Sequence, residues 1–265
     1  MTIYKTTGRT GLFDAEANLE KLTKLGNPLE KLHKVIDFEM FRPELEEHLL
    51  NHDKKSNAGC KPHDVVLMFK IILLERFYNL SDEQAEYQIN DRLSFKEFLG
   101  LSSGDRVPDS RTIWLFQDNL IQKDLEATFF EQFRTYLDNL GLFVNEGKII
   151  DASFVEVPRQ RNNKEENAKI KSGEGAELWK ENPLIERAFK GKPLTDEQKE
   201  SNHIKSKVRC RVEHPFGFVT NSMNDFYIKS IGFRRAKGII GLINLVYNMC
   251  RYEQIVRLNL LPIKC

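Results

Sequence analysis

The chain has 265 residues with balanced charge and an ordinary share of apolar residues. Lys and Arg number 40 against 39 Asp and Glu, which gives a formal net charge of +1, and 40% of the residues are hydrophobic. This length and composition predict one large domain or two modest ones. The net charge is no guide to nucleic-acid binding, so any basic surface must be local.

Cysteine spacing and hydropathy argue against several other classes of protein. No Cys-x-x-Cys pair occurs among the four widely spaced cysteines, Cys60, Cys210, Cys250 and Cys265. This spacing argues against a disulfide framework or zinc site and favours free thiols in a reducing cytoplasm. Met1–Thr10 does not read as a secretory signal. The longest uncharged apolar run, Gly238–Cys250, is shorter than the about 20 residues that cross a membrane, so we expect a buried core helix there.

The N-terminal half is predicted to be helical throughout. Apolar residues recur at helical spacing after Pro28 and again after Pro43. Pro62 is predicted to open an apolar helix over Val65–Tyr78, since proline is tolerated in a first turn. A further amphipathic helix is predicted over Glu126–Leu140.

Three shorter helices are predicted from their start and stop signals. Capping boxes are read at Ser81–Gln84 and at Ser94–Glu97, and the second of these helices is stopped by Gly100. Asp109 is predicted to cap a helix over Thr112–Leu120. Small helices joined by tight turns suit a helix-turn-helix arrangement and an ordinary helical bundle equally well.

The sequence changes character at Lys148. The β-branched and apolar residues of 148–158 predict one buried strand that carries Asp151. The polar stretch that follows, Arg159–Leu178, is predicted to be an exposed loop or a frayed helix. Because a buried unpaired carboxylate is costly, Asp151 needs a partner, an exposed strand end or a metal ion. A hydrogen-bonded residue at a strand edge and a magnesium ligand both remain open.

Glu213 is the second candidate carboxylate, and it follows a basic stretch in the last third of the chain. A third capping box at Thr195–Gln198 predicts the helix that contains it. A carboxylate that holds a metal beside several cations could neutralise phosphates and activate a nucleophile. The alternative is a solvated helix in which Glu213 pairs with Arg209, four residues earlier on the same face.

Basic residues gather between Lys190 and Lys237, where eleven Lys or Arg face five Asp or Glu. This excess suits a phosphate-binding face, although lysine runs are often simply solvated. The candidate DNA contacts in this segment are Lys205, Lys207, Arg209, Arg211, Arg234 and Arg235.

Several motifs, in order along nearly the whole chain, resemble transposases of the bacterial insertion-sequence five group. They are Leu80–Phe95, Phe98–Leu101, Val107–Trp114, Ile150–Val155, Arg211–Phe218 and Ala236–Tyr252. The resemblance implies an Asp-Asp-Glu catalytic triad in a ribonuclease-H-like domain, with Mg²⁺ or Mn²⁺ as cofactor. It assigns Asp151 as the first acid and Glu213 as the last, each as catalytic residue and metal ligand.

The second acid of the triad has no match in this sequence. Trp179–Pro183 resembles the segment soon after the first acid, whereas Lys190–Gln198 already resembles the segment before the last helix. The point at which the two segments are joined therefore falls within Asn182–Lys192. The strands that lie between these segments in the family are expected to be absent. Pro215 stands where the family usually has a branched apolar residue, and it is expected to bend the helix near Glu213.

The resemblance implies a mainly α fold with two parts. Residues 1–142 would form a helical bundle with a helix-turn-helix-like part for DNA binding and assembly. Residues 143–265 would form a truncated ribonuclease-H-like α/β domain.

The resemblance therefore implies a transposase-family protein that binds the terminal inverted repeats of a transposon but has lost catalysis. We expect it in the cytoplasm, associated with the nucleoid. Its expected partners are DNA and either a second copy of the chain or an intact transposase. No association with a membrane is expected. The alternatives are an active metal-dependent recombinase and a DNA-binding regulator of an intact transposase. A helical protein with no DNA role is disfavoured by the motif series.

Overall fold

The structure is a computed structural model that describes residues 14–50, 61–102, 104–142, 194–224, 228 and 230–260. For residues 205 and 207–213 it describes the backbone only. The described residues fall into two compact units. One unit is made of those within Met1–Phe143 and Phe218–Cys265, and the other of those within Val144–Gly217.

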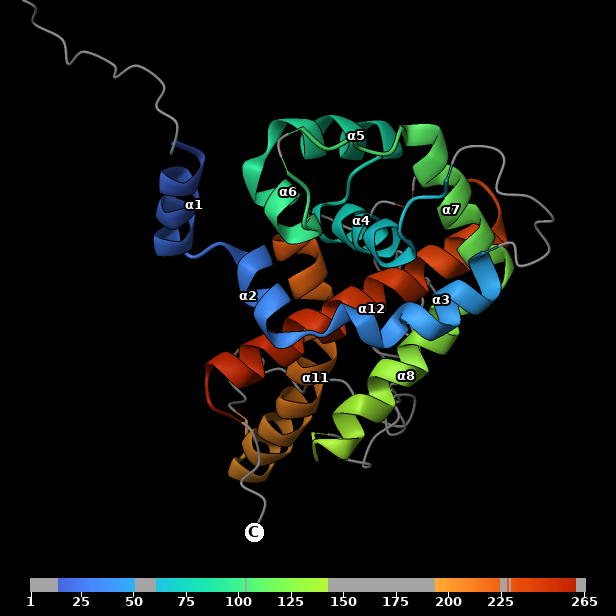
Figure 1. The fold of residues 1–265 in the computed structure, drawn as a ribbon. Helices are drawn as coiled ribbons and strands as arrows, with labels where there is room; N and C mark the ends of the chain where they lie inside the picture. The colour runs from blue at the N-terminus through green and yellow to red at the C-terminus, as the bar shows by residue number, and fades with distance from the viewer. Residues whose placement is uncertain are drawn as a thin grey trace, which may run out of the picture. The chain divides into compact units, whose positions relative to one another are not determined.

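The larger unit is built of helices, seen in Figure 1. Its elements are α1 (Asp14–Leu25), α2 (Pro28–Val35), the 3-10 turn η1 (Phe38–Phe41), α3 (Arg42–Leu49), α4 (Val65–Tyr78), α5 (Asp82–Asp91), α6 (Leu93–Leu99), α7 (Ser110–Gln122), α8 (Leu125–Asn139) and α12 (Phe233–Arg257). Another helix, α11 (Asp196–Ser222), begins in the smaller unit and ends in the larger one.

No strand occurs in the described ranges, so the mainly α expectation is confirmed for them. The predicted strand around Asp151 and the join within Asn182–Lys192 lie outside the described residues. The ribonuclease-H-like part of the fold prediction therefore stays a prediction.

Helix α4 forms the centre of the larger unit because its side chains are apolar on every face. Ten of its residues are buried, from Val65 to Arg76. The Asp64 carboxylate caps the helix by accepting hydrogen bonds from the amides of Val66 and Leu67, both at 2.9 Å. The predicted bounds of this helix are confirmed, but the prediction that Pro62 lies in its first turn is wrong, since the cap is Asp64.

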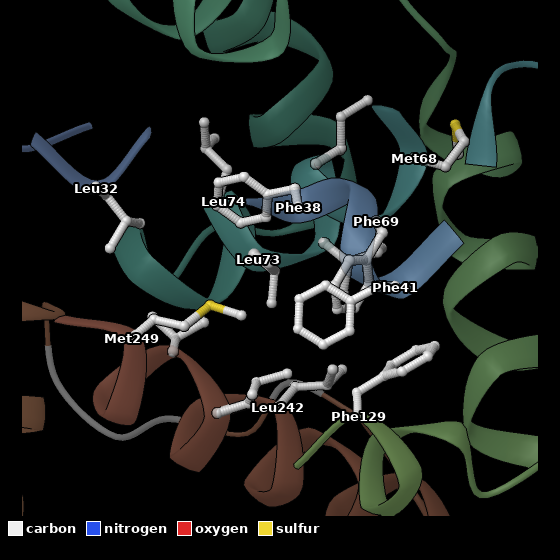
Figure 2. Close-up of a cluster of buried hydrophobic side chains, with 14 of the residues drawn as sticks. Leu32, Phe38, Phe41, Met68, Phe69, Leu73, Leu74, Phe129, Leu242 and Met249 are labelled. Carbon is white, nitrogen blue, oxygen red and sulfur yellow. The ribbon is translucent and has the colours of Figure 1, made fainter. Parts of the chain in front are cut away.

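An aromatic cluster joins α4 to its neighbours, as Figure 2 shows. The Phe69 ring lies 5.1 Å from that of Phe41 and 4.9 Å from that of Phe129, measured between centroids. All three side chains are fully buried. Large aromatic rings that meet in tilted geometry contribute packing energy beyond the area they bury, so this cluster ties η1 and α8 to the central helix.

Helix α12 packs along α8, α4 and α7, and two glycines allow its close approach to α7 and α8. A Cβ added to Gly238 would lie 2.7 Å from two side-chain carbons of Ile121, and one added to Gly241 would lie 2.9 Å from Cγ of Glu126. Nine residues of α12 are buried, including Leu242 and Met249, which face the core in Figure 2. The expectation of a buried core helix over Gly238–Cys250 is therefore confirmed.

The end of α11 is fixed to the end of α4 by two asparagines. Asn79 and Asn224 both have left-handed backbones, with φ of 50° and 57°. The Asn79 side-chain amide donates to the Asn224 carbonyl at 2.9 Å, and the Asn224 amide donates to the Tyr78 carbonyl at 3.3 Å. By packing, the end of α11 and all of α12 thus belong to the unit of the N-terminal helices. The division at residues 142 and 143, which rests on motifs, stays a prediction.

Most of the predicted helix signals are confirmed by their hydrogen bonds. Ser81 and Gln84 form both bonds of a capping box, as do Thr195 and Gln198. Asp109 accepts from the Thr112 amide at 2.8 Å. Gly100 ends α6 with a φ of 74°.

The predicted capping box at Ser94–Glu97 is wrong. The one residue between α5 and α6 is Arg92, which has an extended backbone and serves as the C-cap of the first helix and the N-cap of the second. With so short a connection, Ser94 is already inside α6, and no side chain caps this helix.

Candidate nucleic-acid interface

The two predicted catalytic acids are not brought together by anything in the described part of the structure. Asp151 lies outside the described residues, and for Glu213 the backbone in α11 is described but the side chain is not. Pro215 lies inside α11, and the helix continues beyond it to Ser222. The approach of the two acids, the pairing of Glu213 with Arg209 and the bend near Pro215 all stay predictions.

Some of the predicted DNA contacts are described with their side chains and others only by their backbone. Lys205, Lys207, Arg209 and Arg211 are placed on α11 by their backbone, and their side chains lie outside the described residues. Arg234 and Arg235 are described in full, in the first turn of α12.

Arg235 connects α12 to α7 through its guanidinium group. Its Nε donates a hydrogen bond to Oδ1 of Asp118 at 2.8 Å, and its guanidinium carbon lies 5.4 Å from the centroid of the Trp114 ring. The hydrogen bond and the charge of Asp118 raise the pKa of Arg235. An arginine has five N–H donors, so the pair with Asp118 leaves others able to bind a phosphate.

Arg234 makes a second connection one residue earlier. Its Nη2 donates to Oδ2 of Asp124 at 3.1 Å and also to the carbonyl of Gln122. Asp124 stands at the turn between α7 and α8. Both arginines therefore already connect α12 to α7 and to the turn before α8, although solvent screening keeps exposed ion pairs of this kind weak.

The face of α7 beside these arginines is exposed although it carries large side chains. Arg111, Trp114 and Leu115 share one side of the helix, while Ile113 and Gln117 point into the core. Trp114 is 42% exposed and Leu115 is 53% exposed.

We call the residues Arg111, Trp114, Leu115, Arg234 and Arg235 the α7/α12 surface. Aromatic rings interleaved with guanidinium groups are typical of surfaces that contact nucleic acids. Sequence reasoning selected the two arginines of α12 and missed the α7 residues. The spacing of Arg111, Trp114 and Leu115 on one helix face was the signal available.

A buried polar network lies between α7 and α4. Nη2 of Arg76 donates to Oε2 of Glu75 at 3.0 Å and to Oε1 of Gln117 at 3.1 Å. Burial raises the pKa of Glu75 to about 8 and also raises that of Asp82. The negative charge of Asp82 raises the pKa of Glu75 further, whereas the charge of Arg76 lowers it. Sequence reasoning did not single out these residues, since they are placed by the packing of three helices.

Possible metal ligands in the described ranges gather at one place, which includes none of the predicted ligands. Glu44, Glu47 and His48 lie close together on α3, partly exposed. Nδ1 of His48 lies 3.0 Å from the carbonyl of Glu44. Such groups are common at protein surfaces without an ion.

Two further expectations concern the apolar end of the chain. Cys250 is a free, buried thiol, and burial raises its pKa to about 12. Among the described residues, no helix is both long enough and apolar enough to span a membrane.

Comparison with known families gives two matches along this chain. The family described as Transposase domain (DUF772) matches residues 17–119, which include Arg111 and Trp114. The family described as Transposase DDE domain matches residues 166–249, which include Glu213 and begin after Asp151. No solved structure matches the chain. A transposase domain followed by a transposase DDE domain indicates an insertion-sequence transposase, a protein of DNA transposition.

Proposed function

We propose that this protein binds the terminal inverted repeats of an insertion sequence of the five group and has lost the ability to cut them. The observation that carries the loss of catalysis is the missing second acid. Segments that resemble the two sides of that acid, Trp179–Pro183 and Lys190–Gln198, stand almost next to each other in this chain. The strands that should carry the acid are therefore deleted, and the ribonuclease-H-like domain within 143–265 is truncated.

The remaining acids do not fit the cofactor that such a transposase needs. Two-metal sites hold ions about 3.5–4 Å apart and stabilise both the attacking and the leaving oxygen. Asp151 and Glu213 supply two carboxylates where the triad supplies three, which leaves two divalent cations short of anionic ligands.

DNA binding is supported by two separate features. The segment from Lys190 to Lys237 has more than twice as many basic as acidic residues, and four of the predicted DNA contacts lie on α11 within it. The α7/α12 surface adds an exposed tryptophan held beside an arginine. Phosphates attract the first feature, and bases or sugars can stack on the second.

A protein that binds the ends without cutting them can act as a regulator of an intact transposase. The helices of residues 1–142 pack with α12 around one continuous apolar core, so the part proposed for DNA binding and assembly is not interrupted by the deletion. We propose that the chain joins a second copy or an intact transposase on the DNA, at the nucleoid. The competing proposal is an active recombinase.

The test is a gel-shift series with a labelled transposon end, from low to physiological salt. Because binding to phosphates releases counterions, we expect affinity to fall steeply as salt rises. Absent binding at low salt, or binding that does not change with salt, would contradict the DNA role. The same reactions with Mg²⁺ or Mn²⁺ decide between the regulator and the recombinase by whether cut DNA appears.

A further inference from the structure

Two neighbouring apolar side chains at the start of α12 are almost fully exposed to solvent. Ile231 is 91% exposed and Phe233 is 88% exposed, the highest values for large apolar residues in the described part of the chain. Gly232 between them has a φ of 106°, and apart from its two chain neighbours no atom of the described residues lies within 4 Å of where its Cβ would be. The Ile231–Phe233 turn therefore projects into open space with apolar side chains on both sides of the glycine.

The residues that follow this turn connect it to α7 and α8. Arg234 pairs with Asp124, and Arg235 pairs with Asp118 and lies over Trp114. One turn further on, Gly238 lies against Ile121. The beginning of α12 is thus fixed to α7 and α8 at three successive points. A rigid projection of this kind cannot cover its apolar side chains by folding back onto the core.

The charges around the turn indicate which partner would cover it. Lys123, Arg234, Arg235 and Lys237 are the basic residues nearby in the described parts of the two joined segments, against Asp118, Asp124 and the buried Glu126, whose pKa is raised by burial. A second copy that met this turn with its own would bring like charges together. A polyanion has the complementary charge, and proteins that bend DNA insert apolar side chains between base steps beside arginine and lysine.

We propose that Phe233, supported by Ile231, inserts as a wedge between stacked base pairs of the bound DNA while the adjacent basic residues hold the phosphates. This proposal rests on the DNA binding proposed above. Insertion would unstack one base step and kink the duplex, at a cost that is lowest at flexible steps such as TA. The side chain does not read the base sequence, so the wedge works on any flexible step.

The experiment uses the full chain and a short A·T-rich duplex that carries the fluorescent adenine analogue aminopurine at a central TA step. Unstacking makes this analogue brighter, so the wild-type protein should raise its fluorescence at low salt. Phe233→Ala should abolish the increase, whereas Phe233→Leu, which keeps an apolar wedge, should retain part of it. Affinity in a gel shift should fall by no more than about tenfold, because phosphate contacts supply most of the binding.

The matched control is Leu258→Ala, which removes an exposed apolar side chain beyond the other end of the same helix. It should leave the fluorescence increase unchanged, and circular dichroism should show all the variants folded. If wild type and Phe233→Ala bind and give the same increase, or if binding gives none, the wedge is refuted while DNA binding stands. If the wild-type protein does not bind at low salt, the proposed function and the wedge both fail.

Discussion

Gly238 in α12 and Ile121 in α7 are in such close contact that a methyl group on the glycine would lie 2.7 Å from both γ-carbons of the isoleucine. Ile121 is buried and β-branched, so its side chain has little freedom to move aside. The contact sets how closely α12 approaches α7, and with it the position of the two arginines in its first turn.

Gly238→Ala should therefore destabilise the protein, although alanine favours helices. Overpacking of a well-packed core costs about 1–3 kcal/mol, more than the propensity gain. Urea unfolding followed by circular dichroism measures the change. Gly217→Ala is the matched control, since it adds the same methyl group to α11 at a position where no atom of the described residues outside the adjacent helix lies within 4 Å, and it should stabilise slightly or have no effect. Equal stability of Gly238→Ala and wild type would contradict the close contact.

The buried Glu75 carboxyl predicts a dependence of stability on pH. Burial raises its pKa from 4.5 to about 8, so between these values the folded chain holds a proton that the unfolded chain has released. The stability that this group contributes is thus complete below pH 4.5 and is lost as pH rises towards 8. Glu75→Gln, which stays neutral, should gain stability relative to wild type across this window.

Urea unfolding midpoints of both proteins at several pH values check this prediction. Glu20→Gln on α1, which removes an exposed carboxylate, is the control for the loss of one acidic side chain. A Glu75→Gln curve parallel to the wild-type curve would mean that this carboxyl is already ionised in the folded protein.

Charge reversal on the exposed face of α7 tests the α7/α12 surface. Arg111→Glu should weaken DNA binding by about tenfold at low salt and reduce the slope of log affinity against log salt by about 1, as for one lost phosphate contact. Lys21→Glu makes the same change of charge on α1 and should have a smaller effect on both. If the two variants bind alike, general charge rather than this surface governs the affinity.

The proposed loss of the second acid predicts that purified protein neither nicks nor joins transposon ends with Mg²⁺ or Mn²⁺. Asp151→Asn should then change nothing, because no complete metal site is present to be broken. Gel analysis of end-labelled DNA measures both reactions. Cleavage by wild type that Asp151→Asn abolishes would show that another residue completes the site. Restoring the missing strands from an intact relative should be required for activity.

Local sequence determined the helices where a signal acts on its nearest neighbours. The Ser81–Gln84 box, the Asp109 cap and the stop at Gly100 each depend on groups within four residues, so reading the chain was enough. The prediction of a capping box at Ser94–Glu97 was wrong because α5 ends at Asp91 and α6 begins at Leu93, with Arg92 alone between them. That boundary depends on how α5 and α6 pack. The motifs that point to a transposase were also readable in order along the chain, whereas the loss of the second acid stays a prediction.

Only the tertiary structure decided which of these residues meet. Arg235 and Asp118 are 117 residues apart in sequence, and nothing in either segment predicts that a guanidinium from α12 would lie on a tryptophan of α7. Glu75 likewise looks like one helix residue among others until α4, α5 and α7 close around it and burial raises its pKa. Capping and periodicity are short-range properties of the backbone, whereas surfaces, ion pairs and buried charges arise from contacts between helices, which are fixed when the whole core packs.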